Sequence, residues 1–191
     1  NGNEKWTKQV GSLNGKPRRE AFHDLAISPD EEYIYAVGYT FGEFNNSIYD
    51  HHNDNKHGVL ISKIRNDGTE EWTKLSYSGI YDNLSTNLFG ELDIPKRTIN
   101  FTDGYYKSHS VSIDNNENLY IGGSVTNKWG YSELLLTKHD KNGNSLSNIY
   151  DVSVVSNKHD YIEDVSTDKD GNDLYITTAN SNDQTNVITY I

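Results

Sequence analysis

The chain has no cysteine among its 191 residues, so neither disulfides nor thiol chemistry can contribute to its fold or function. It also has no stretch approaching the ~18–20 apolar residues of a transmembrane helix, and membrane insertion is not expected. Long apolar runs at helical spacing are missing as well. The sequence contains instead short apolar–polar alternations separated by Asn, Asp, Gly and Ser, the pattern typical of an all-β protein.

Positive charge is scarce. Lys and Arg number 17 against 28 acidic residues, which gives a formal net charge of −11. Because phosphate contacts need clustered Lys and Arg, nucleic acid is not an expected partner, and anionic membrane surfaces are disfavoured for the same reason. Aromatic residues make up 12% of the chain, so the composition is not that of a disordered protein. The length fits one domain with a buried core.

A hairpin pattern recurs along the chain. It is clearest in residues 58–75, GVLISKIRNDGTEEWTKL, where a strand, a tight turn and a second strand are expected. The chain opens with similar text, NGNEKWTKQV, in which Trp6 aligns with Trp72. A third copy, ELLLTKHDKNGNSLSN, aligns Gly143 with Gly68. Self-similarity at tens of residues indicates a repeat architecture.

The first half of each unit recurs in step. Val111 lies 86 residues after Leu25, and Val165 lies 54 residues after Val111. Segment 76–104 matches no other segment and is interpreted as an insertion that lengthens the first step. In the first unit, residues 25–28, 33–37, 59–64 and 71–74 are predicted to form one four-stranded antiparallel sheet. The equivalent tyrosines of the second strands are Tyr35, Tyr120 and Tyr175.

The text SVSIDNNENLYIGGSV with LLLTKHDKNGN, together with LISKIRNDGTEEWTK, resembles the bacterial β-propeller repeat often called SBBP. The resemblance implies an all-β fold of propeller-type blades, each of four antiparallel strands, with about three blades' worth of sequence here. It also implies a secreted or cell-surface location and a scaffold rather than a reaction. The expected divisions are 1–10 (outer strand of a split blade), 20–75 (blade), 76–104 (insertion), 105–151 (blade) and 158–191 (first three strands of a blade).

A four-stranded blade cannot bury both of its faces alone, so the blades are expected to stack face to face. The three equivalent tyrosines should then be buried, and Tyr120→Ala and Tyr175→Ala should each cost roughly 3–5 kcal/mol. Trp6 and Trp72 should cover blade edges on outer strands. The backbone should be kept thin where blades meet by Gly38, Gly122 and Gly123.

In a propeller, the loop that enters the innermost strand and the loop between strands two and three open on one axial face. By the alignment His23, His109 and Glu163 occupy equivalent positions and are expected to ring the axis. A polar ring with aromatic flanks suits a sugar or a peptide, although these groups could equally satisfy one another. The predicted ligand-binding residues are His23, Asp24, His109, Trp129, Tyr131, Glu163 and Asp164.

Two segments are weaker candidates for a metal. The loop 49–57, YDHHNDNKH, offers His51, His52, Asp54 and His57, but its spacing matches no closed zinc pattern. Asp168 and Asp170 resemble the start of a calcium loop. No acidic residue closes that loop at its twelfth position, so a β-turn explains the same residues. No cofactor is expected, with calcium left open.

The sequence favours a binding or structural repeat protein outside the cell, with a protein or a glycan as partner. Trp129 and Tyr131 are predicted to stack on a glycan. The alternative is a carbohydrate-active hydrolase or lyase on the same scaffold, which would need paired carboxylates ~5–10 Å apart. No G-x-S-x-G, Walker-type or H-E-x-x-H motif occurs, no catalytic residue is assigned, and enzymatic activity is the less favoured reading.

Three blades cannot close a propeller, which needs about four to eight. Two apolar faces should therefore be exposed unless the rest of a longer repeat chain or another copy of this chain covers them. By the repeat register, Asn1 falls two residues after Ile191, within one hairpin turn. Residues 1–10 are therefore expected to pair with 187–191 as an outermost strand, in this molecule or in another, and the sequence is expected to be an excerpt or a processed fragment.

Overall fold

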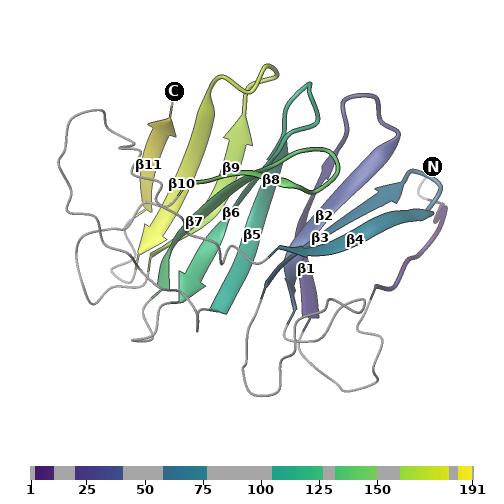
Figure 1. Ribbon diagram of the computed structural model, residues 1–191, viewed down its shortest axis with the longest axis horizontal. Coiled ribbons are helices and arrows are strands. Elements are labelled where there is room, and N and C mark those ends of the chain that lie inside the picture. Colours follow the sequence, from purple (N-terminus) through teal and green to yellow (C-terminus); the bar gives the residue numbers. More distant parts are fainter. Residues whose placement is uncertain are drawn as a thin grey trace.

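The computed structural model describes residues 3–10, 20–40, 58–76, 105–126, 132–149, 160–180 and 185–190. Every regular element in these ranges is a β-strand, and the strands form three antiparallel sheets that lie side by side in chain order (Figure 1). Among the described residues there is no helix that could cross a membrane. The chain is thus all-β, as its alternations predict.

The first sheet has the order β1-β2-β3-β4 and the second the order β5-β6-β7-β8. The third has the order β11-β10-β9, and among the described strands none pairs the third sheet with the first. The strands of the first sheet are β1 (Glu20–Ile27), β2 (Tyr33–Thr40), β3 (Gly58–Arg65) and β4 (Glu70–Ser76). Those of the second are β5 (Tyr105–Ile113), β6 (Leu119–Thr126), β7 (Ser132–His139) and β8 (Ser145–Ile149). Those of the third are β9 (Asp160–Thr167), β10 (Leu174–Asn180) and β11 (Thr185–Tyr190).

The predicted four-stranded sheet of the first unit is confirmed, and its turns explain why. Glu31, Glu117 and Gly171 stand at the same place in the turns between the first two strands of their sheets, with φ of 60°, 59° and 71°. The amide of each residue bonds the carbonyl three residues earlier. The first unit lacks the glycine of the third at this place, yet Glu31 adopts the same left-handed conformation, so all three sheets begin with one turn type.

The sheets stack through their first strands. β5 packs across β1, β2 and β3 of the first sheet, and β9 packs across β5, β6 and β7 of the second. One buried cluster fills the first of these interfaces with side chains from both sheets, and a second cluster fills the other. The first cluster comprises Tyr35, Val37, Val59, Ile61, Tyr106, Val111, Leu119, Ile121, Val125 and Leu135. The second comprises Tyr120, Leu134, Leu136, Ile162, Val165, Leu174 and Ile176.

The equivalent tyrosines are not all buried. Tyr35 is 0% exposed and Tyr120 is 5% exposed, but Tyr175 is 47% exposed. Each buried ring reaches the following sheet: the Tyr35 hydroxyl donates to Glu117 Oε2 at 2.7 Å, and the Tyr120 hydroxyl donates to the Gly171 carbonyl at 3.2 Å. The predicted burial of Tyr175 is wrong because the residues that would cover it belong to a following sheet, and none is described.

The three glycines serve two different purposes. A Cβ on Gly122 would lie 2.5 Å from Ile162 Cγ2 of the third sheet, so this glycine keeps the backbone thin where two sheets meet, as predicted. Gly38 and Gly123 do not. A Cβ on either would strike a backbone carbonyl of the first strand in its own sheet, that of Ala21 at 1.8 Å or that of Lys107 at 1.9 Å.

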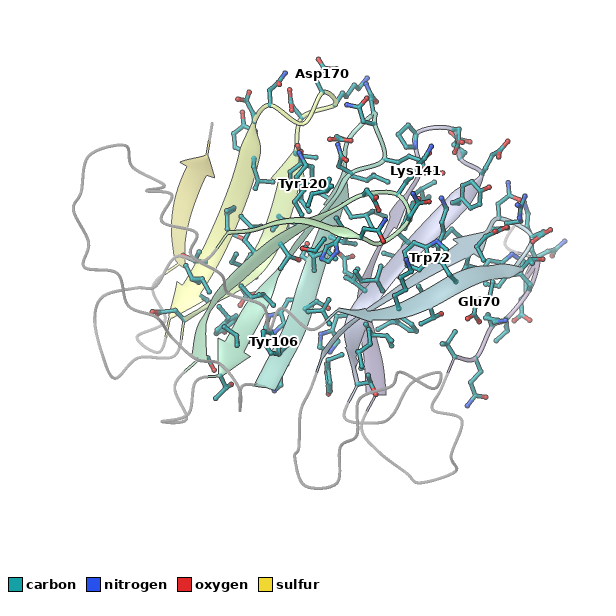
Figure 2. All side chains as sticks on the ribbon, in the orientation of Figure 1. Glu70, Trp72, Tyr106, Tyr120, Lys141 and Asp170 are labelled. Carbon is teal, nitrogen blue, oxygen red and sulfur yellow. The ribbon has the colours of Figure 1, made fainter. Side chains whose placement is uncertain are left out.

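Two tryptophans occupy matching environments. Trp72 on β4 lies against Gly143 in the β7–β8 turn of the second sheet, and Trp6 lies against Gly68 in the β3–β4 turn of the first. Figure 2 shows Trp72 and Lys141 near the place where the first two sheets meet. Residues 3–10 belong to no strand, so the predicted pairing with 187–191 is not formed within this chain. Trp6 nevertheless contacts the β3–β4 turn of the first sheet, as Trp72 contacts the β7–β8 turn of the second.

Candidate binding site on the inner strands

Each first strand contains one bulge, at the same place in all three sheets. In β1 the pairing with β2 passes from Phe22 to Asp24 and leaves His23 as the extra residue. The corresponding extra residues are His109 in β5 and Glu163 in β9. A bulge bends the strand and re-aims the side chain of the extra residue. The three positions that the repeat makes equivalent are therefore also equivalent in backbone geometry.

These bulges bring four aromatic rings into a row, which we call the ring row: Tyr39, His23, His109 and Tyr161. The centroids of neighbouring rings lie 5.2 Å, 5.8 Å and 5.4 Å apart, and each pair meets edge to face. The row therefore spans β2, β1, β5 and β9 of all three sheets. His23 is exposed, the other three rings are half-buried, and the Lys107 ammonium lies 5.9 Å from the centre of the Tyr39 ring.

The histidines of the row are oriented by the backbone and by burial. His23 Nδ1 lies 2.8 Å from the carbonyl oxygen of Ser108. Because a carbonyl only accepts, Nδ1 of His23 carries the proton and donates it to this oxygen. The pKa of His109 lies below its ordinary value of 6.5, first because burial disfavours its charge and then because His23 adjoins it, with Glu163 partly offsetting both effects. The row can thus offer a neutral imidazole and aromatic edges to a ligand.

The residues that follow the bulges join neighbouring sheets. Asp24 Oδ2 accepts a hydrogen bond from the Val111 amide at 2.8 Å, and Ser110 Oγ accepts one from the Val165 amide at 3.2 Å. Ser110 Oγ also donates to Asp164 Oδ1 at 2.6 Å. Asp24 and Asp164 are therefore already engaged between sheets, although both were predicted to contact a ligand. Their role as ligand contacts stays a prediction.

Sequence reasoning found two of the four rings and missed the others. Tyr39 shares a face of β2 with Tyr35, so period-two alternation could have found it. Tyr161 has no such signal, because its one neighbour in the ring row, His109, comes from another sheet. Ser110 could have been found, since the offsets of 86 and 54 residues align it with Asp24 and Asp164. The candidates Trp129, Tyr131, His51, His52, Asp54 and His57 lie outside the described residues.

The calcium-like segment is a turn. Asp168 Oδ1 accepts hydrogen bonds from the amides of Asn172 and Asp173, at 2.7 Å and 3.1 Å. Asp114 and Asp140 cap their own turns in the same way. Asp170 lies at the outer tip of the β9–β10 turn (Figure 2). In the part of the chain that the structure describes, no three His, Asp or Glu side chains group closely enough to hold a metal ion.

Comparisons with known proteins identify no family for this chain. No protein-family model matches the chain, and no curated protein matches it in sequence. Among solved structures, the chain is similar to the periplasmic gluconolactonase of Pseudomonas aeruginosa, with 12% sequence identity and a TM-score of 0.33. The match covers 86% of this chain and 52% of the gluconolactonase, so the chain spans about half the length of that protein.

Acid should destabilise the fold through its buried histidines. The pKa values of His109 and His139 both lie below 6.5, chiefly because burial disfavours the imidazolium. The folded state therefore holds these protons less tightly than the unfolded chain. Stability is then highest above about pH 6.5 and is lost as the pH falls from there to the lowered folded values.

Urea unfolding at about pH 7.5 and about pH 5 measures this loss. We expect His139→Gln, which removes the more deeply buried ring, to reduce the difference in unfolding free energy between the two pH values. The exposed His23 supplies the control, since His23→Gln should change that difference less. An equal pH dependence in wild type and His139→Gln would contradict the expectation.

Proposed function

We propose that this chain is a β-propeller-type repeat protein, or part of one, that acts outside the cell or at its surface as a binding module. The observation that carries this proposal is the ring row, in which four aromatic rings from all three sheets adjoin one another at the bulges. Repeated sheets of one design, each with its bulge at the same place, are a scaffold that presents equivalent side chains along one line.

The chemistry of the row suits a glycan. Aromatic rings pack against the apolar faces of sugars, and an imidazole nitrogen with an exposed carboxylate can bond hydroxyl groups. His23 and Glu163 are exposed, so a ligand can reach them. A protein partner that presents hydroxyl-rich or aromatic side chains would use the same groups. Trp129 and Tyr131, predicted from the sequence, would extend the surface.

Binding is favoured over hydrolysis by the state of the carboxylates. A glycoside hydrolase on this scaffold would need two carboxylates free to act as acid and base. Of the carboxylates at the bulges, Asp24 and Asp164 are held in hydrogen bonds between sheets. Glu163 is then left without an acidic partner among these residues. The arrangement favours recognition of an intact ligand.

A glycan array probed with the purified chain tests the proposal. We expect hits whose affinity falls about tenfold or more in His23→Ala and Tyr39→Ala, which corresponds to ~1.4 kcal/mol or more. Leu146→Ala is the matched control, because Leu146 is an exposed apolar residue of β8, which lies at the opposite edge of the second sheet from β5, and it should leave binding unchanged. An array without hits, or hits that tolerate both ring-row substitutions, would refute glycan binding at this row.

A further inference from the structure

The first strand of the chain exposes apolar side chains at positions that are buried elsewhere. Leu25 is 59% exposed, whereas its equivalents Val111 and Val165 are 6% and 4% exposed. Phe22 is 36% exposed, and its equivalent Ile162 in the third sheet is 2% exposed. With Ile27, which is 55% exposed, these residues form what we call the β1 face. In the second and third sheets the same side of the first strand packs on the preceding sheet.

The third sheet, at the opposite end of the molecule, exposes a tyrosine whose equivalents are buried. Tyr175 on β10 is 47% exposed, although Tyr35 and Tyr120 at the same position are buried under the following sheet. We call the side of the third sheet that carries Tyr175 the β10 face. Residues 3–10 and β11 lie at opposite ends of the line of three sheets (Figure 1). The β1 face and the β10 face therefore also lie at opposite ends of the molecule.

The structure contains the interface between such faces twice. Between the first and second sheets, and again between the second and third, a first strand packs across the three strands before it. In both, a tyrosine hydroxyl reaches the turn that follows that first strand: Tyr35 bonds Glu117, and Tyr120 bonds the Gly171 carbonyl. By the same geometry Tyr175 would reach the turn of Glu31. Each open face is therefore the continuation of an interface that this sequence already forms with itself.

The N-terminal segment fits the same scheme. Trp6 contacts Gly68 as Trp72 contacts Gly143, its Nε1 donates to the Asn66 carbonyl at 2.9 Å, and Lys8 pairs with Glu70 at 3.3 Å. Since Trp72 lies on the fourth strand of the preceding sheet, residues 3–10 run where the fourth strand of a sheet before β1 belongs. The third sheet has only three described strands and ends at β11. A third sheet docked on the β1 face would meet residues 3–10 at its β11 edge, in the place of a fourth strand.

We propose that the β10 face binds the β1 face of a second copy of this chain, head to tail, with residues 3–10 of one copy added to the β11 edge of the other. The described part of two copies provides six sheets, within the four to eight that close a propeller, whereas that of one copy provides three and that of three copies provides nine. The product is thus a closed dimer with two identical interfaces. The number of copies rests on the propeller-type arrangement proposed above, but the pairing of the two faces does not.

Mass measurement by light scattering and by sedimentation, over a range of micromolar concentrations, tests the proposal. We expect the wild-type chain to be a dimer. Leu25→Asp damages the β1 face and Tyr175→Asp the β10 face, so each variant alone should be monomeric, with its dissociation constant raised at least about a hundredfold. Both residues are exposed in the single chain, so both variants should keep the circular dichroism spectrum of a β protein.

An equimolar mixture of the two variants is the decisive sample. It contains one undamaged β1 face and one undamaged β10 face, so a dimer with a single intact interface should reappear, weaker than wild type. The control is Leu146→Asp, which places a charge on an equally exposed apolar residue of β8 and should remain dimeric. The mass measurement does not depend on any glycan. Dimer formation and glycan binding are therefore tested separately, and either proposal can be refuted while the other stands.

Three results would overturn the proposal. A wild-type chain that stays monomeric at every concentration shows that the faces do not bind each other. A mixture of folded variants that stays monomeric shows that the contact is not head to tail. A dimer that tolerates Leu25→Asp and Tyr175→Asp shows that other surfaces hold the copies together.

Discussion

Replacing Tyr35 by alanine should lower the free energy of unfolding by roughly 3–5 kcal/mol. The Tyr35 ring is fully buried between the first and second sheets. Its centre lies 6.3 Å from the centre of the Trp72 ring and 4.9 Å from the Lys63 ammonium. Its hydroxyl donates to Glu117 of the second sheet, and burial together with this bond raises the pKa of the phenol. Alanine leaves a cavity at the interface and removes the hydroxyl donor from the Glu117 carboxylate, which keeps its ion pair with Lys63 at 3.4 Å.

Two further variants separate the contributions at Tyr35. Tyr35→Phe keeps the ring and loses the bond to Glu117, so it should cost about 1.5 kcal/mol, the lower end for a hydrogen bond to a charged group. Tyr175→Ala changes the equivalent residue of the third sheet, which is half-exposed in the single chain, and should cost under ~1 kcal/mol when the chain is monomeric. Urea unfolding measures all three. Equal losses for Tyr35→Ala and Tyr175→Ala would contradict the assignment of burial to the following sheet.

The contrast between these tyrosines marks how far the sequence predicts the fold. The repeat predicted the strands of the first sheet and the equivalence of Tyr35, Tyr120 and Tyr175, because alternation and turn residues are local signals. Burial is not local. It is supplied by the next sheet, so a residue of the last described sheet repeats the sequence of the others without repeating their environment.

The candidate site was predictable only in part for a similar reason. The alignment placed His23, His109 and Glu163 at one position but could not reveal that each is the extra residue of a bulge. A bulge adds a residue on one strand alone, so it can be recognised only from the pairing of that strand with its neighbour. The glycines Gly38 and Gly123 carried that information: both stand opposite the bulges, where a Cβ would meet a carbonyl of the bulged strand. The sequence interpretation assigned them to contacts between sheets instead.

Gly122, the one glycine of the three that does lie between sheets, gives the second large effect. Gly122→Ala should cost roughly 1–3 kcal/mol, because the new methyl would lie 2.5 Å from Ile162 Cγ2 and 2.6 Å from Val165 Cγ1 of the third sheet. Ile162→Ala should cost roughly 2–5 kcal/mol on its own, since it empties a buried site at the same place. Hydrogen exchange should show the loss of protection concentrated in β9 and β10, with β2 and β3 less affected.

The double variant decides whether Gly122 sets the spacing of the sheets. Removing Ile162 Cγ2 relieves the closer of the two clashes with the methyl on residue 122 and leaves the one with Val165 Cγ1. The loss of unfolding free energy in the double variant should therefore be smaller than the sum of the two single losses by at least about 1 kcal/mol. The matched control combines Gly122→Ala with Ile61→Ala, a buried residue of the other core cluster, and these two losses should add within ~0.5 kcal/mol. Additive losses in both pairs would mean that the third sheet moves away from the second as a body, so that close packing at Gly122 is not what holds them together.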